Sequence, residues 1–117
     1  MNVASRIKFA LSQFGDPVFG GTKESVTDLP DTGKYYTFTI ITLGADFADN
    51  KPQVERYLVT INFFCPLNFK FEARRRATKQ VLFDADFTWP STTDASDADG
   101  RHIVFECETI EGVDVDG

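Results

Sequence analysis

The residues of this sequence that could take part in chemistry are mostly basic, and they gather in one short segment. Residues 70–79 hold five basic side chains and one acidic side chain, a net charge of +4. The whole chain has a formal net charge of −6, so the remainder carries −10, and residues 94–117 alone contribute −7. The charge is therefore divided along the chain, and the basic segment predicts contact with an anionic partner. The five basic residues are Lys70, Arg74, Arg75, Arg76 and Lys79.

The sequence offers little for catalysis or for metal binding. It has one histidine, His102, which alternates with Ile103 and is expected on the solvent side of a strand, and it lacks the common nucleophile, phosphate-loop and zinc-protease motifs. The two cysteines, Cys65 and Cys107, are expected to be buried free thiols, too few for a zinc site. Residues 95–106 fall partly in an EF-hand register; a solvated turn over 94–100 is the simpler interpretation, and weak cation binding by the clustered carboxylates is the alternative. We expect no enzyme, no cofactor and no metal site.

The length of 117 residues predicts a single domain spanning 1–117. No apolar run is long enough to cross a bilayer, and the first residues do not resemble a signal peptide, so a cytosolic origin is expected. Residues 2–14 are predicted to form an amphipathic helix that Gly15 ends, followed by a loop over 15–33. The stripe that predicts this helix is formed by Val3, Ile7, Ala10, Leu11 and Phe14.

Two alternating runs, 34–43 and 54–65, predict a pair of antiparallel strands. The polar stretch between them, 44–53, is expected to be an exposed connection. Phe47 lies inside it without apolar periodicity, which makes it a candidate contact with a partner. The alternative is a hairpin tip whose Phe packs back locally.

The second half repeats the pattern of helix and hairpin. Asn68 is a candidate N-cap for a helix over 69–85. Residues 87–89 can start a strand, which Pro90 places at an edge or a bulge, and 101–110 form the last strand. The predicted fold is α+β: an N-terminal helix, a β-hairpin, a helix and a β-hairpin. The antiparallel or mixed four-stranded sheet has its helices packed on one face.

Consecutive arginines cannot share one face of the predicted helix, because each residue turns by about 100°. Arg74 falls on the apolar side. Arg76 points away from it, close in angle to Lys79 and Phe83. An outward Phe beside Arg and Lys is typical of the centre of a protein interface. Arg75, Arg76, Lys79, Phe83 and Phe47 are therefore the candidate interface residues; the alternative is a solvated basic face with one exposed Phe.

Nucleic acid is the less favoured partner of this helix. The field of a −10 remainder opposes approach to phosphate. A second copy, presenting its own acidic C-terminal half, matches the basic segment better. A contact between two different patches is heterologous, and such contacts close into rings when the rotation permits.

The sequence resembles small tailed-phage proteins of the tail terminator and tail completion type. The likeness covers most of the chain and rests on the pattern of its segments rather than on an active-site signature. The chain departs from the pattern at Asp86, where such endings usually carry Gly. The segments that carry the likeness are Gly15-x-Pro17-Val18, YYTF (35–38), VERYLVTINFF (54–64), LFDADFTW (82–89) and RHIVFECETI (101–110).

This resemblance implies a structural virion protein of a phage or prophage, without catalysis or cofactor. Such minor tail proteins form hexameric rings that end the tail tube and join it to the head–tail connector. The implied partners are copies of the chain, the tail tube protein and the connector. The implied location is the virion tail, after assembly in the cytoplasm of the bacterial host. The alternative function is a nucleic-acid-contacting regulatory or packaging accessory protein that uses residues 70–79.

Overall fold

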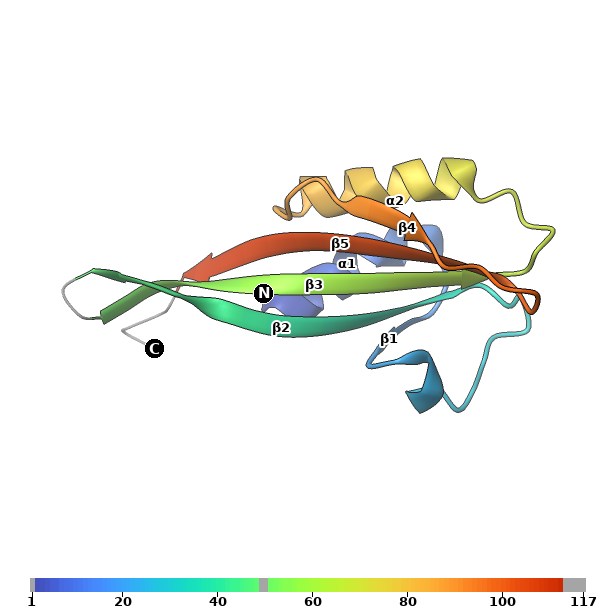
Figure 1. Cartoon of the computed structure of the whole chain (residues 1–117), viewed down its shortest axis with the longest axis horizontal. Helices are drawn as coiled ribbons and strands as arrows, with labels where there is room; N and C mark the ends of the chain where they lie inside the picture. Colours follow the sequence, from blue (N-terminus) through green and yellow to red (C-terminus); the bar gives the residue numbers. More distant parts are fainter. Residues whose placement is uncertain (1, 49–50, 113–117) are drawn as a thin grey trace.

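The computed structural model describes residues 2–48 and 51–112, with the side chains of residues 2–43 and 55–111. Within these ranges, two α-helices and two short 3-10 helices accompany a five-stranded mixed sheet (Figure 1). The strand order is β1-β2-β3-β5-β4; β1 is parallel to β2, and the other neighbours are antiparallel. The elements are α1 (Val3–Leu11), η1 (Ser12–Phe14), β1 (Val18–Gly20), η2 (Lys23–Ser25), β2 (Tyr35–Ala48), β3 (Lys51–Cys65), α2 (Glu72–Asp84), β4 (Ser91–Asp94) and β5 (Arg101–Gly112).

The predicted α+β class is confirmed, but the sheet has five strands rather than four. The additional strand is β1, which lies in the predicted loop 15–33 and pairs Val18 with Tyr36 of β2. Its three residues are too few to show a period of two, so the pairing depends on the neighbouring strand. The predicted strand start at 87–89 is also wrong, because β4 begins after Pro90, at Ser91.

The predicted N-terminal helix is confirmed as α1 and the 3-10 turn η1. The Ser5 amide donates to Asn2 Oδ1 at 2.8 Å, which satisfies one of the free amides of the first turn. Gly15 ends the turn with a φ of +77°, a left-handed conformation that glycine adopts without steric cost.

The second helix is shorter than predicted. The prediction of 69–85 with Asn68 as N-cap is wrong at its start, since α2 begins at Glu72 and Phe71 caps it without a side-chain bond. The Phe69 amide donates to the Pro66 carbonyl at 3.0 Å, so a turn occupies these residues instead. At the other end, Asp86 has a φ of +71°, the conformation that a glycine would take most easily.

The molecule measures 54 × 27 × 23 Å, and the hairpin of β2 and β3 runs along its longest dimension. The predicted strand ends at 43 and 54 are wrong, because β2 continues to Ala48 and β3 begins at Lys51; the exposure predicted for the side chains of 44–53 lies outside the described side chains. Residues 49–50 lie outside the described residues. Two register shifts let the ladder continue through this polar stretch. The last β3–β5 pair is Val54 with Gly112, and beyond it the described hairpin pairs only within itself. We call this part the arm; Figure 1 shows it projecting past the helices.

The core lies between one face of the sheet and both helices. The alternation predicted for the central strands is confirmed, since the inward side chains of β2, β3 and β5 are buried. Both helices contribute to the same cluster and contact each other, so they cover one face, as predicted. The largest members of the cluster are Ile7, Leu11, Tyr36, Ile61, Phe63, Leu82 and Phe105.

Candidate interaction surface

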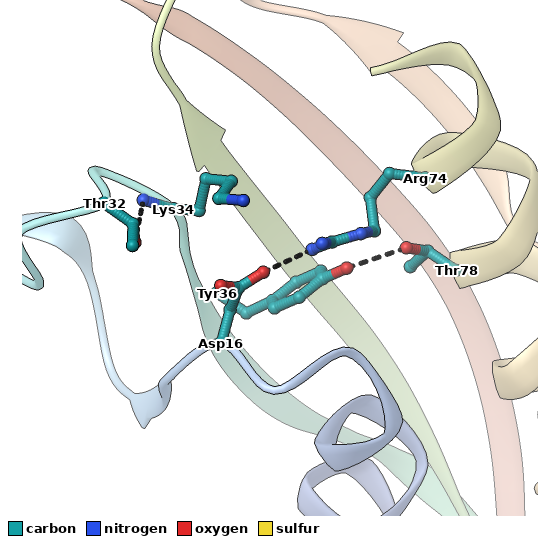
Figure 2. A network of polar contacts seen from close by, with 6 residues as sticks. All are labelled: Asp16, Thr32, Lys34, Tyr36, Arg74 and Thr78. Atoms are coloured by element: carbon teal, nitrogen blue, oxygen red, sulfur yellow. Dashed lines mark hydrogen bonds and ion pairs between the residues drawn. The ribbon is translucent and has the colours of Figure 1, made fainter. Parts of the chain in front are cut away.

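The inward side of α2 carries a buried ion pair (Figure 2). Arg74 Nη1 donates to Asp16 Oδ2 at 2.6 Å, and the two side chains are only 13% and 10% exposed. The Arg74 guanidinium also lies 4.7 Å from the ring centroid of Phe14 and 5.1 Å from that of Phe63. The prediction that Arg74 falls on the apolar side is confirmed. Its charge is neutralised inside the fold and is not available to a partner.

A second polar contact fixes α2 to the sheet. Tyr36 on β2 and Thr78 on α2 share a hydrogen bond of 2.9 Å between their hydroxyl oxygens, and both side chains are fully buried (Figure 2). Burial raises the pKa of Tyr36, and the hydrogen bond with Thr78 opposes that rise. The phenol therefore stays neutral and acts as a structural link between β2 and the helix.

The outward side of α2 presents an exposed cluster. Arg76 and Phe83 lie in solvent, and the Phe83 ring meets the ring of Trp89 edge-on, with centroids 5.6 Å apart. Lys79 Nζ lies 5.9 Å from the centroid of Trp89. Phe83 and Trp89 are 51% and 53% exposed, so the two rings shield each other only in part. Arg76, Lys79, Phe83 and Trp89 are called the α2 patch below.

Two predicted interface residues lie elsewhere. Arg75 Nη2 donates to Glu72 Oε2 at 2.8 Å, and its Nη1 reaches Thr92 on β4 at 3.4 Å. Arg75 therefore spans α2 and the edge strand. The backbone of Phe47 pairs with Pro52 in the arm, and the side chain of Phe47 lies outside the described residues.

Trp89 was not among the residues predicted to form an interface. Residues 87–89 are predicted to start a strand, in which Phe87 and Trp89 would lie on one face and be buried to a similar degree. In the structure Phe87 is buried and Trp89 is exposed. The Thr88 amide donates to the carbonyl of Glu108 at 2.8 Å, which holds the segment along the edge of β5. The sequence does contain a signal for this difference. Pro90 cannot donate a ladder hydrogen bond, which argues against a regular strand that runs through 87–90.

The sheet face opposite the helices is called the open face. At the end away from the arm, the segment of η2 and the turn before β5 form the walls of a hollow of about 730 Å³. His102 lies on this face, as predicted, but it is half-buried and stacks on Phe64 with centroids 4.3 Å apart. Its Nε2 is 2.8 Å from Asn62 Oδ1, and the Asn62 amide donates to Thr37 at 3.2 Å. Burial, followed by the charge of Lys23, lowers the pKa of His102.

The remaining candidate groups for chemistry are occupied or buried. Cys65 and Cys107 are free and buried, as predicted, and burial raises the pKa of Cys107 to about 12. Asp94 and Asp97 each accept a hydrogen bond of 2.9 Å from a backbone amide of their turn, donated by Ser96 and Asp99 respectively. Within residues 2–48 and 51–112 no three His, Cys, Asp or Glu side chains are grouped to hold a metal ion. The described helices include none that is long and apolar enough to cross a membrane.

Comparisons with known proteins give information on the fold of this chain and none on its function. No family model and no curated protein matches the chain. Nine chains of solved structures match it. One of them, whose name states no function, matches with a TM-score of 0.63 over 98% of this chain and 96% of its own, at 10% sequence identity. At this identity the match shows that the α+β fold recurs, and nothing beyond the fold.

Proposed function

We propose that this chain is a non-enzymatic structural protein of a phage or prophage tail. In this role it forms a ring, hexameric by the resemblance of its sequence, that ends the tail tube and joins it to the head–tail connector. Its partners are then copies of itself, the tail tube protein and the connector. Assembly takes place in the cytoplasm of the bacterial host, and the mature location is the virion tail.

The observation that carries the proposal is the α2 patch. Its two aromatic rings are half-exposed beside Arg76 and Lys79, a composition typical of the centre of a protein interface. The contacts that attach α2 to the fold, through Arg74 and Thr78, lie on the other side of the helix. The patch is therefore free to bind a partner without loss of the fold.

The pairing of the arginines disfavours the nucleic-acid alternative. Two of the five basic residues, Arg74 and Arg75, already have carboxylate partners in the described structure. Affinity for nucleic acid increases with the number of cation–phosphate contacts, so three remaining cations support weak binding. A duplex DNA titration by fluorescence anisotropy should show no binding at physiological salt. Tight, salt-sensitive binding there would favour the alternative.

Mass measurement tests the proposal most directly. Light scattering of the purified chain, alone and with tail tube protein, should show a ring-sized species, which electron microscopy should reveal at the ends of tails. Salt should weaken the ring because its contacts are partly electrostatic. A chain that stays monomeric at high concentration, and that does not assemble on tail tube protein, would contradict the proposal.

The arm offers a second test, by complementation of a phage that lacks this gene. Beyond Val54 the described arm residues pair only with each other, so replacing 45–51 with a short Gly-containing turn leaves every backbone pair between β3 and β5 in place. We expect nearly unchanged thermal stability and loss of assembly onto tails. The control is an arm of the original length with its polar side chains permuted. Full infectivity from the shortened protein would show that the arm is dispensable.

A further inference from the structure

A heterologous ring needs a second surface that differs from the α2 patch, and the open face supplies one near the arm. Ile41 on β2 pairs with Leu58 on β3, and Leu58 pairs with Glu108 on β5. Ile110 lies two residues after Glu108, so its side chain points to the same face. Ile110 pairs with Arg56, so it lies diagonally from Leu58, and the three aliphatic side chains are neighbours on three adjacent strands. Ile41, Leu58 and Ile110, with Glu106 and Glu108, are called the open-face patch.

The open-face patch is uncovered in the described structure. Ile41 is 55% exposed and Ile110 is 59% exposed. The other end of the same face is different, because Tyr35 and Phe64 there are 4% and 8% exposed. Single exposed aliphatic side chains are common, whereas two exposed isoleucines on either side of the half-buried Leu58 mark a candidate interaction surface.

The charge beside these side chains is negative on balance, because Glu106 and Glu108 outnumber Arg56, the strand partner of Ile110. Glu106 is exposed and has no ion-pair partner among the described side chains. Glu108 Oε1 lies 3.2 Å from Arg56 Nη2, and both of these side chains are about half exposed. An exposed ion pair of this kind adds little to the stability of the fold, so Glu108 can leave Arg56 for a cation of a partner at a small cost in free energy. The open-face patch therefore combines aliphatic side chains with carboxylates, and the α2 patch combines aromatic rings with cations.

We propose that the open-face patch receives the α2 patch of a second copy of this chain. The inference rests on the proposed self-assembly and names the surfaces that carry it. Phe83 and Trp89 pack on Ile41, Leu58 and Ile110, while Arg76 and Lys79 meet Glu106 and Glu108. The two patches lie on opposite sides of the sheet, since α2 covers the face away from Ile41.

The charges disfavour the symmetric arrangements. An α2 patch facing its own copy would bring Arg76 and Lys79 against like charges, and an open-face patch facing its own copy would do the same with its glutamates. Each subunit therefore uses one patch toward one neighbour and the other patch toward the next. Such a head-to-tail contact closes into a ring when its rotation permits.

Two variants, each broken at one patch, test this arrangement. The first is Arg76→Glu with Phe83→Asp, and the second is Glu106→Lys with Ile110→Lys. All four side chains are exposed, so both variants should give the far-ultraviolet circular dichroism of the native chain. Each variant alone should be monomeric by light scattering, because every contact in the ring needs both patches.

An equal mixture of the two variants should form dimers and nothing larger. The intact open-face patch of the first variant binds the intact α2 patch of the second, and the broken patches then face outward. Light scattering should give twice the 13.1 kDa mass of the chain. The matched control is Lys8→Glu with Phe9→Asp, an exposed cation and Phe on α1, which should assemble as the native chain does.

The outcomes separate this inference from the proposed function. If the native chain forms rings but the mixture stays monomeric, or if either variant still forms rings alone, the patches are wrong and the proposed function stands. If the control variant also fails to assemble, the effect is not specific to the patches and the inference is overturned. If the native chain is monomeric even with tail tube protein, both are overturned. Where a variant loses its circular dichroism signal, Arg76→Gln with Phe83→Ser, or Glu106→Gln with Ile110→Ser, takes its place.

Discussion

The two sides of α2 differ in what their polar groups do. On the inward side, Arg74 is paired with Asp16 and enclosed by aromatic rings, and Thr78 holds the hydroxyl of Tyr36. On the outward side, Arg76 is exposed in solvent, and no ion-pair partner for it is found among the described side chains. The same residue type, two positions apart on one helix, is a structural element in one case and a candidate binding group in the other.

This difference shows that the run of three arginines is not one basic patch. A helix turns by about 100° per residue, so Arg74, Arg75 and Arg76 meet the core, the edge strand and solvent in turn. Charge summed along the sequence overstates the basic surface that a partner meets.

Removing Arg74 should have the largest effect. Arg74→Ala leaves the Asp16 carboxylate buried without its partner, and breaking a buried pair costs about 3–5 kcal/mol of unfolding free energy. Urea denaturation followed by circular dichroism measures the loss. Arg76→Ala is the matched control and should stay within about 0.5 kcal/mol of the native chain. Equal losses in the two variants would remove the distinction between the two sides.

Thr78→Val should destabilise the chain by about 1–3 kcal/mol, because it keeps the shape but leaves the buried hydroxyl of Tyr36 without its partner. The double variant with Tyr36→Phe should recover much of the loss, since neither polar group then remains. The coupling of the two substitutions in urea denaturation isolates their contact. Fully additive losses would show that Tyr36 and Thr78 contribute independently.

His102 should make stability depend on pH. Its pKa is lowered from its ordinary value of 6.5, so the folded chain holds the neutral imidazole and the unfolded chain takes up a proton more readily. The contribution is therefore present above pH 6.5 and is lost as the pH falls through the folded pKa. The urea midpoint of the native chain should fall relative to that of His102→Gln on acidification. A constant difference would show that His102 titrates alike in both states.

The outward substitutions should have the smallest effect on stability. Arg76→Glu with Phe83→Asp changes exposed side chains only, so the unfolding free energy should change by about 0.5 kcal/mol or less per substitution. Assembly should be lost nevertheless. Melting followed by circular dichroism checks the first statement, and light scattering checks the second. A large fall in the melting temperature would mean that Phe83 contributes to the core.

Periodic patterns predicted most of the regular elements. The stripe of α1, the alternation of β2 and β3 near the core, and the last strand are local features that a sequence shows directly. The phase of α2 also placed Arg74 inward and Phe83 outward, as the structure has them. The predicted start of α2 was wrong. Asn68 has a side chain that can cap a helix, but it lies within the turn that begins at Pro66. Trp89 was missed because its exposure depends on how the segment follows the edge of β5.

By itself, the sequence determined the α+β class, the core faces of the strands and the division of α2 into two sides. Each follows from a repeat of two or of 3.6 residues, and such a repeat is local. Only the tertiary structure decided the parallel pairing of β1, the continuation of the hairpin into the arm and the partner of Arg74. Asp16 and Arg74 are 58 residues apart in the chain, and β1 is a strand only because Tyr36 lies beside it. These features depend on contacts between distant segments, which no local pattern records.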